Sequence, residues 1–256
     1  MPTIRADDRT LQARLAISLA LVAGHVNIVA VLTCGVVASH MTGHAGALGR
    51  EVVEARFGEA AFLVALLGAF LAGAFLAGLS VEVGRARGWR SVYALPAAIE
   101  LALLVAFATG VELHDPSAIE MGPGRWWMGA VAALAMGVQN ATVTRISSGV
   151  VRTTHLTGIL TDIGHESARL AVVRRLVARG RASGVDADAG VRGTGVGEWR
   201  LVLLAGIFGA FLAGSALGTL SFAYWPRWSM VPPVALLLWI VVHDLSVPIG
   251  GAEREA

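Results

Sequence analysis

Apolar residues are grouped into six runs, each long enough to cross a lipid bilayer as a helix. A helix rises 1.5 Å per residue, so about 20 apolar residues span a hydrocarbon layer of roughly 30 Å. The runs cover residues 14–36, 60–80, 91–111, 126–146, 200–221 and 229–247. The pattern predicts an all-α polytopic integral membrane protein with six transmembrane helices, forming a single membrane domain over residues 1–256.

Two of these runs continue into polar stretches that resemble each other. In both stretches a glycine precedes an asparagine by three residues, and a histidine, an apolar residue, a threonine and a glycine follow. The matched residues are Gly24 with Gly137, Asn27 with Asn140, Ser39-His40-Met41-Thr42-Gly43 with Thr154-His155-Leu156-Thr157-Gly158, and Gly49 with Gly164. The recurrence predicts two repeats, residues 14–111 and residues 126–247.

A second match supports this division. The sequence GAFLAG occurs at 68–73 and again at 209–214, in each case within the second run of its repeat. Small residues continue at four-residue spacing in both runs, which favours close packing of helix backbones. Because each repeat has an odd number of spans, the second enters the membrane from the opposite side. Inverted repeats with interrupted helices are a common plan of transporters, whose binding site lies at the repeat interface.

The composition agrees with a lipid environment. The chain is 55% hydrophobic and 15% charged, and its mean hydropathy is +0.68. The net charge of +2 gives no reason to expect nucleic acid as a partner. The single cysteine, Cys34, excludes an intramolecular disulfide. We expect the first apolar run to be a retained helix rather than a signal peptide.

The arginines predict an orientation. With the N-terminus inside, 16 of the 20 basic residues fall on the cytoplasmic side, so both termini are expected in the cytoplasm. Residues 165–199 are expected to lie on the same side, as a basic amphipathic helix followed by a flexible Gly-rich loop.

The repeated polar residues are the candidates for binding a substrate. Asn27 and Asn140 either hydrogen-bond between helices or coordinate a ligand, and the sequence leaves both interpretations open. The glycines of the HMTG and HLTG motifs resemble the start of a half-helix, where free N–H groups attract an anion. The histidines either cap these helices or carry a proton. The candidate residues are Asn27, His40, Thr42, Gly43, Glu100, Gln139, Asn140, His155, Thr157, Gly158 and Asp162.

Glu100 lies near the middle of the third apolar run. A carboxylate inside a membrane is costly, which makes it a candidate proton relay or cation ligand. The alternative is a protonated, hydrogen-bonded packing residue.

A metal-dependent hydrolase is the main alternative. Its candidate ligands are His40, His44, His155, Asp162, His165 and Glu166. However, the repeat partner of His44 is Ile159, which cannot bind a metal. The sequence also lacks a HExxH motif, a GxSxG elbow and a phosphate-binding loop. We therefore expect no enzyme activity, no bound metal and no cofactor.

At these motifs the chain resembles the YoaK-like family of six-helix bacterial membrane proteins. The resemblance rests on HMTGHAGALG at 40–49, MGVQNATVTR at 136–145 and TTHLTGILTDIG at 153–164. One departure is visible, because relatives usually read TGN where this chain reads Thr42-Gly43-His44. The family is of uncharacterised function, so the resemblance implies a bacterial inner membrane location and no particular substrate.

Together these features predict a small-solute transporter or permease of unknown substrate, with proton coupling as an option. Its expected partners are the lipid bilayer and the solute, a homo-oligomer is left open, and nucleic acid is not expected. A structural membrane protein whose motifs only pack helices is the third alternative.

Overall fold

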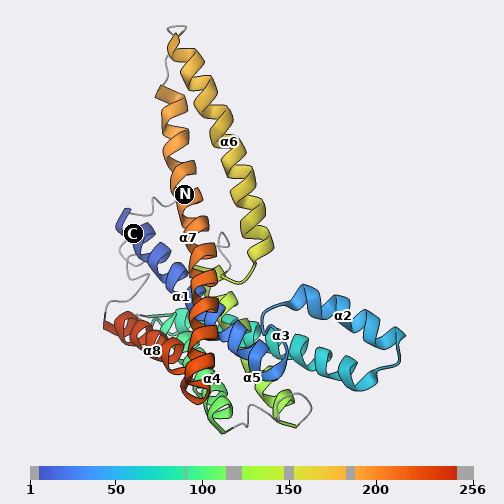
Figure 1. Cartoon of the computed structure of the whole chain (residues 1–256). Coiled ribbons are helices and arrows are strands. Elements are labelled where there is room, and N and C mark those ends of the chain that lie inside the picture. The colour runs from blue at the N-terminus through green and yellow to red at the C-terminus, as the bar shows by residue number, and fades with distance from the viewer. Residues whose placement is uncertain (1–5, 90, 114–122, 147–152, 183–187, 247–256) are drawn as a thin grey trace.

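The computed structural model describes residues 6–89, 91–113, 123–146, 153–182 and 188–246. Within these ranges the fold is all-α, as predicted, with eight α-helices and one short 3-10 helix (Figure 1). The helices are α1 (Ala6–Cys34), α2 (Met41–Val53), α3 (Phe57–Ala86), α4 (Ala94–Leu113), α5 (Pro123–Ile146), α6 (Leu156–Ala182), α7 (Asp188–Tyr224), η1 (Pro226–Trp228) and α8 (Val231–Ser246).

Among the described residues, five helices are long and apolar enough to cross a membrane. These segments are Ala13–Cys34, Phe57–Ala86, Ala94–Leu113, Gly197–Tyr224 and Pro226–Leu245. Each coincides with one of the runs predicted from the sequence, although most extend further at one or both ends. The chain is therefore a helical protein of membrane type.

The sixth predicted span, residues 126–146, is helical as α5 but is not among the five apolar segments. Its C-terminal half carries polar side chains, including Gln139, Asn140 and Thr142, which lower its hydropathy. These three side chains are buried, because α5 packs against α1, α3 and α4. A helix shielded by other helices does not need an apolar surface on all sides, so its hydropathy alone underestimates how well it fits inside a membrane bundle.

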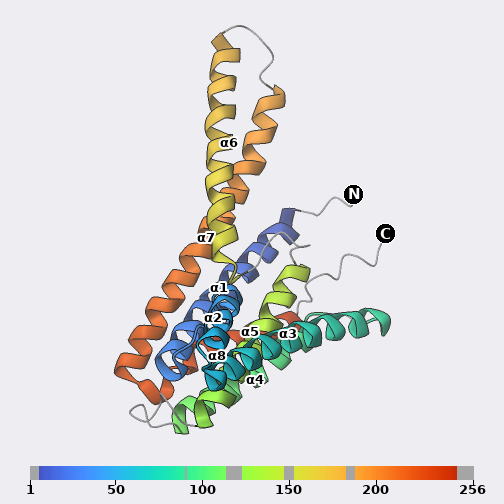
Figure 2. The same cartoon turned by 90° about the vertical axis from the view of Figure 1, so that its right-hand side faces the viewer.

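The segment 165–199 differs from the prediction. Its basic part does lie in a helix, α6, which begins earlier, at Leu156. The Gly-rich part was expected to be a flexible loop, but residues 188–199 form the start of α7, and residues 183–187 lie outside the described residues. Helical packing explains the difference, since α6 and α7 form a hairpin that projects from the bundle in both views (Figures 1 and 2). Arg174 of α6 binds Glu198 of α7 at 2.7 Å within that hairpin.

Glycines allow α1 and α7 to touch through their backbones. A Cβ atom on Gly24 of α1 would lie 2.0 Å from the carbonyl oxygen of Phe211 in α7. In the opposite direction, a Cβ atom on Gly214 of α7 would lie 2.0 Å from the carbonyl oxygen of Leu21. No larger residue fits at either position without separating the helices.

The same contact recurs between α5 and α3. A Cβ atom on Gly137 of α5 would lie 2.1 Å from the carbonyl oxygen of Phe70 in α3. A Cβ atom on Gly73 of α3 would lie 2.1 Å from the carbonyl oxygen of Leu134. These four residues are the sequence counterparts of those in the α1–α7 contact. The small-residue spacing therefore packs helices as predicted, and it pairs a helix of each half with one of the other half.

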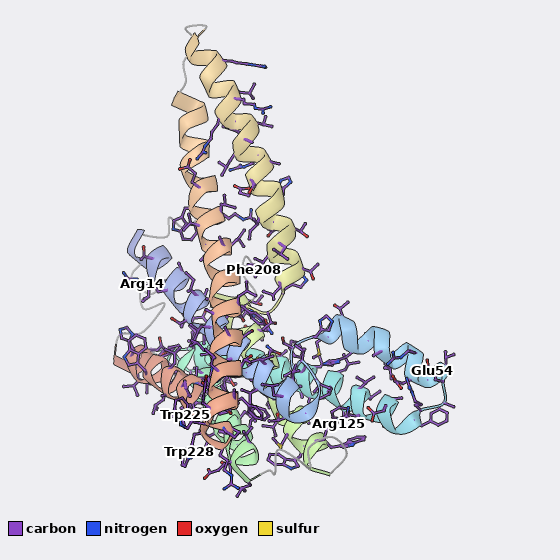
Figure 3. All side chains as sticks on the ribbon, viewed as in Figure 1. Arg14, Glu54, Arg125, Phe208, Trp225 and Trp228 are labelled. Carbon is purple, nitrogen blue, oxygen red and sulfur yellow. The ribbon has the colours of Figure 1, made fainter. Side chains whose placement is uncertain are left out.

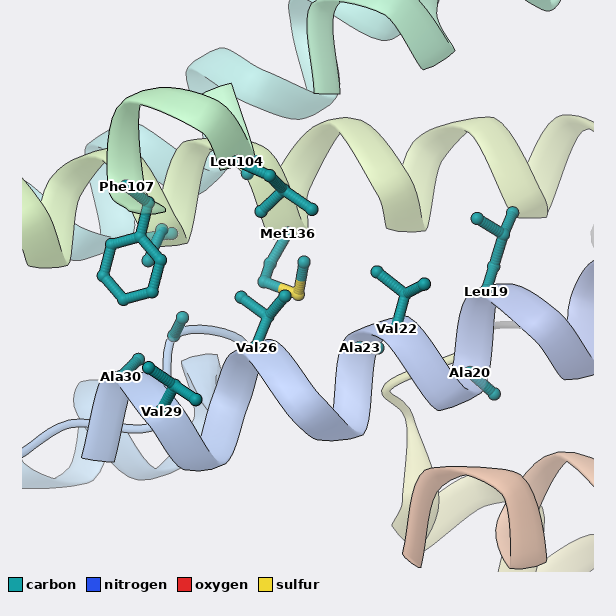
Figure 4. Close-up of a cluster of buried hydrophobic side chains, with 14 of the residues drawn as sticks. Leu19, Ala20, Val22, Ala23, Val26, Val29, Ala30, Leu104, Phe107 and Met136 are labelled. Carbon is teal, nitrogen blue, oxygen red and sulfur yellow. The ribbon is translucent and has the colours of Figure 1, made fainter. Parts of the chain in front are cut away.

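α1 and α5 lie side by side and run antiparallel at the centre of the bundle. The Nε–H group of Arg125, near the start of α5, donates to the carbonyl of Cys34 at the end of α1. Gln139, sixteen residues from the start of α5, instead donates to the carbonyl of Leu19. Figure 4 shows Val26 of α1 directed toward Met136 of α5, with Leu104 of α4 beside them. The core is therefore built where α1, α4 and α5 meet.

Aromatic and basic side chains mark the two ends of the bundle. Arg125, Trp225 and Trp228 lie toward one end in Figure 3, and Arg14 lies toward the other. Tryptophan favours the interface between lipid and water, where its ring is apolar and its N–H group remains hydrated.

Candidate functional site

Asn27 anchors the chain that follows α1. The Oδ1 atom of this buried side chain accepts hydrogen bonds from the backbone N–H of Ser39 at 3.0 Å and from its hydroxyl at 3.1 Å. Its Nδ2 atom donates to the carbonyl of Ala23 at 2.8 Å. Because Asn27 lies seven residues before Cys34, the last residue of α1, these bonds return the chain alongside α1 before α2 begins. The asparagine thus places the start of α2 within the depth of the bundle.

Asn140 anchors the start of α6 in the corresponding way. Its Nδ2 atom donates to the carbonyl of Met136 at 3.0 Å and to the hydroxyl of Thr154 at 2.6 Å. Thr154 is the sequence counterpart of Ser39, and Asn140 is also largely buried. Both repeated asparagines therefore hold the start of a following helix. The sequence match contains these hydroxyl partners, but the prediction did not name them as functional residues.

The two asparagines do not pair with each other. We expected Asn27 and Asn140 to face each other across a pseudo-two-fold axis. Instead, the Nδ2 atom of Asn27 approaches the Sδ atom of Met136 at 3.8 Å, one helical turn before Asn140. Asn27 of α1 therefore lies opposite Met136 and not opposite Asn140. The amides stabilise two separate sites, one in each half.

A histidine immediately precedes each of the two helices. The carbonyl of His40 accepts the N–H of His44 in α2, and the carbonyl of His155 accepts the N–H of Ile159 in α6. Each imidazole lies over a glycine: a Cβ atom would be 2.0 Å from the His40 ring at Gly43 and 2.3 Å from the His155 ring at Gly158. The glycines of both motifs accommodate the rings in this orientation.

These helix starts are accessible. His40, Thr42, His155 and Thr157 are all exposed, in contrast to the buried asparagines that hold them. The His40 side chain makes no capping hydrogen bond to α2. The motifs thus combine a buried anchor with an exposed first turn, whose N–H groups carry partial positive charge.

His44 breaks the correspondence between the halves, because its counterpart is Ile159. The buried imidazole donates from Nε2 to the carbonyl of Val37 at 2.8 Å. Burial lowers the pKa of His44, His40 lowers it further, and the bond to Val37 offsets part of this effect. His44 therefore serves the folded structure as a neutral side chain.

His44 should make the protein sensitive to mild acid. Because the pKa of His44 is lower in the folded state, its stabilising contribution is present above about pH 6.5 and is lost as the pH falls through the folded value. Lowering the pH from 7 to 5 should reduce the unfolding temperature of the wild type more than that of His44→Ile, measured on purified protein in detergent. Equal reductions would show that His44 does not carry this dependence.

Glu100 and Gln139 lie in the interior of the bundle. Glu100 of α4 is 1% exposed and Gln139 of α5 is fully buried. The Nε2 atom of Gln139 donates to the carbonyl of Leu19 at 2.8 Å. The Oε1 atoms of both side chains have no hydrogen-bond partner among the described residues. Each oxygen therefore needs a hydrogen-bond donor that the described residues do not supply in their usual protonation states.

Asp162 is engaged elsewhere. It accepts a hydrogen bond from Arg200 of α7 at 3.2 Å and so joins α6 to α7 within the hairpin. Glu166, on the same helix, pairs with Arg169. The described residues contain no group of three or more His, Cys, Asp or Glu side chains that could hold a metal. The six residues of the hydrolase hypothesis are thus not brought together as a metal centre.

One buried carboxylate, Glu51, was not anticipated, and its counterpart in the second half was considered only as a metal ligand. Glu51 of α2 is held by Arg50 and Arg56, which lowers the pKa of its carboxyl mainly through the bond from Arg50. Its counterpart in the second half, at the same offset as the HMTG and HLTG motifs, is Glu166, which is buried as well. Continuing the repeat alignment past Gly49 would have identified this pair. The carboxylates extend the correspondence of the two halves into α2 and α6.

Comparison with known proteins adds a family but no activity. No curated protein and no solved structure was found to match the chain. A protein family described as "Protein of unknown function (DUF1275)" matches residues 15–243, which include all eight α-helices at least in part. The chain therefore belongs to the DUF1275 family.

Proposed function

We propose that the protein is a small-solute transporter or permease, and not an enzyme, built from two inverted repeats of three membrane spans. α5 serves as the sixth span, shielded from lipid by its neighbours. The observation that carries this proposal is the recurrence of one contact, Gly24 with Phe211 and Gly137 with Phe70, around two antiparallel helices. Two halves of opposite orientation supply equivalent openings on the two sides of a membrane, which alternating access requires.

The distribution of arginines supports a location in the bacterial inner membrane with both termini in the cytoplasm. In this orientation the start of α2 opens toward the outside and the start of α6 opens toward the cytoplasm. The likeness to YoaK-like proteins agrees with this location. A homo-oligomer is compatible with the proposal but is not required by it.

The two helix starts are the sites at which we expect solute to bind. Both combine an exposed threonine in the first turn, Thr42 or Thr157, with a histidine before it. The free N–H groups of a first helical turn favour an anion or a carboxylate. Asn27 and Asn140 contribute indirectly, because they hold these turns at their depth in the bundle.

Uptake into proteoliposomes tests the proposal. Purified protein should transport at least one solute from a panel of amino acids, other carboxylates, inorganic anions and inorganic cations. Thr157→Val should reduce this uptake about tenfold, which corresponds to a loss of roughly 1.4 kcal/mol of binding free energy. Thr219→Val is the matched control, since Thr219 is also exposed but bonds only to its own helix.

Two results would contradict the proposal. One is the absence of uptake for every solute of the panel by folded protein. The other is an equal loss of uptake in Thr157→Val and Thr219→Val, because transport would then not depend specifically on the start of α6.

A further inference from the structure

Glu100 is a carboxyl group enclosed by apolar helix faces. It shares the buried side of α4 with Pro96, Leu104, Phe107 and Val111. One of its oxygens, Oε1, has no hydrogen-bond partner among the described residues. An ionised carboxylate in such surroundings costs many kcal/mol unless a cation neutralises it. The form of Glu100 that fits this site is the neutral acid.

Gln139 lies at the same level of the bundle. A Cβ atom on Gly110 of α4 would meet Trp127 and Met128 of α5, while Leu104 lies beside Met136 (Figure 4). α4 and α5 are therefore antiparallel. Glu100 precedes Gly110 by ten residues, so it lies level with the residue about ten positions after Trp127 and Met128, which is close to residue 138. The neighbouring Gln139 is fully buried, and its Oε1 atom also lacks a partner.

One proton satisfies both groups. Two buried acceptor oxygens without donors cost about 1–3 kcal/mol each. A proton on Glu100 turns its carboxyl into a donor, and the Oε1 atom of Gln139 is an acceptor whose amide is already fixed by its bond to Leu19. The pair then needs no additional charge, whereas a metal cation would need several more oxygen ligands.

The charged groups on the helices around α4 are engaged elsewhere or lie near helix ends. Arg125 and Arg145 of α5 bind Glu59 and Glu82 of α3, Asp244 of α8 accepts the Ser91 hydroxyl, and His25 of α1 hydrogen-bonds the carbonyl of Ser229. Others are Arg85 of α3, which also approaches Glu82, Arg227 of η1, and His243 of α8, whose ring lies at a tilt against Trp239. None of these contacts supplies Glu100 with a cation.

We propose that Glu100 and Gln139 form a buried site for one proton, and that this proton is the coupling ion of the transporter. The role of this proton as the coupling ion rests on the proposed function, whereas the proton site itself does not. The site exists once per chain, because Val26 occupies the position in α1 that matches Gln139. The proton is held between α4 and α5, so movement of these helices against each other would change its access to water.

Infrared spectroscopy of the purified protein in lipid tests the proton site directly. At pH 7 the wild type should show the C=O band of a protonated carboxyl, and this band should move when glutamate carrying ¹³C in its side-chain carboxyl is incorporated. The band should be absent from Glu100→Gln, which keeps the volume and neutrality of the side chain. Gln139→Leu should shift it to higher frequency, because the hydrogen bond is lost. Glu51→Gln is the control and should leave it unchanged.

Absence of a protonated glutamate band from the wild type would overturn the site, as would its persistence in folded Glu100→Gln. An unshifted band in Gln139→Leu would exclude Gln139 as the partner. Coupling is tested separately in vesicles with a pH gradient, using the panel solute that the wild type takes up. The wild type should accumulate it and Glu100→Gln should only equilibrate it, so accumulation by Glu100→Gln would overturn the coupling. A protein with the band but without uptake of any solute would contradict the transport function alone.

Discussion

Gly137→Leu should destabilise the protein by more than about 3 kcal/mol, at or above the upper end of ordinary overpacking costs. The clash involves the main chain, because a Cβ atom would lie 2.1 Å from the carbonyl oxygen of Phe70, and rotamer changes cannot relieve it. α5 and α3 would have to separate, and α5 carries much of the buried core. The expected result is failure to fold, or an unfolding temperature far below that of the wild type in detergent.

Gly209→Leu provides the matched control for this prediction. Gly209 belongs to the repeated GAFLAG segment but is exposed, and a Cβ atom there would meet nothing within 4 Å. Its variant should unfold at about the temperature of the wild type. If Gly137→Leu were as stable as Gly209→Leu, the close contact between α3 and α5 would not exist.

The second large effect is expected at Asn27. Asn27→Leu keeps a similar volume but removes the acceptor of the N–H and the hydroxyl of Ser39. A fully buried donor left without a partner costs about 1–3 kcal/mol. The two donors of Ser39 are partly buried, and the loss of their shared acceptor should be enough to detach the start of α2 from α1. Hydrogen–deuterium exchange at residues 39–44 should accelerate by about tenfold to a hundredfold, while exchange at the centre of α1 should change little.

Thr33→Val is the control for Asn27→Leu. Thr33 is also a buried polar residue of α1, but its hydroxyl donates only within the helix, to the carbonyl of Val29 at 2.7 Å. Its replacement should leave exchange at residues 39–44 unaltered. Equal protection of this segment in Asn27→Leu and in the wild type would show that the asparagine does not anchor it.

The positions of five apolar helices along the chain could be predicted from the sequence because long apolar runs have few alternative structures in lipid. The prediction placed a half-helix start at the HMTG motif, where α2 begins, but it did not give the extent of this helix, since its thirteen residues are too short and too polar to resemble a span. It also assigned residues 188–199 to a loop, because glycine disfavours isolated helices. In the structure, packing of α7 against α6 outweighs this preference, and Gly197 leaves space for Glu166 and Arg169.

The candidate residues could be selected from the sequence because they recur, but their contacts could not. A repeated asparagine signals a repeated hydrogen bond without identifying its partner. The partners proved to be Ser39 and Thr154, which belong to the same halves, so the expected pairing of Asn27 with Asn140 did not form. The relation between Glu100 and Gln139 depends on how α4 aligns with α5, which the sequence of either helix does not specify.

The most direct test of the account is the side of the membrane to which each helix start is exposed. In a Cys34→Ala background, which removes the single cysteine, Thr42→Cys and Thr157→Cys each place a thiol at an exposed first turn. A maleimide that cannot cross membranes should label Thr42→Cys when added outside intact cells, and should label Thr157→Cys only in inverted vesicles. Labelling of both positions from the same side would contradict two halves of opposite orientation, and with them the proposed transporter.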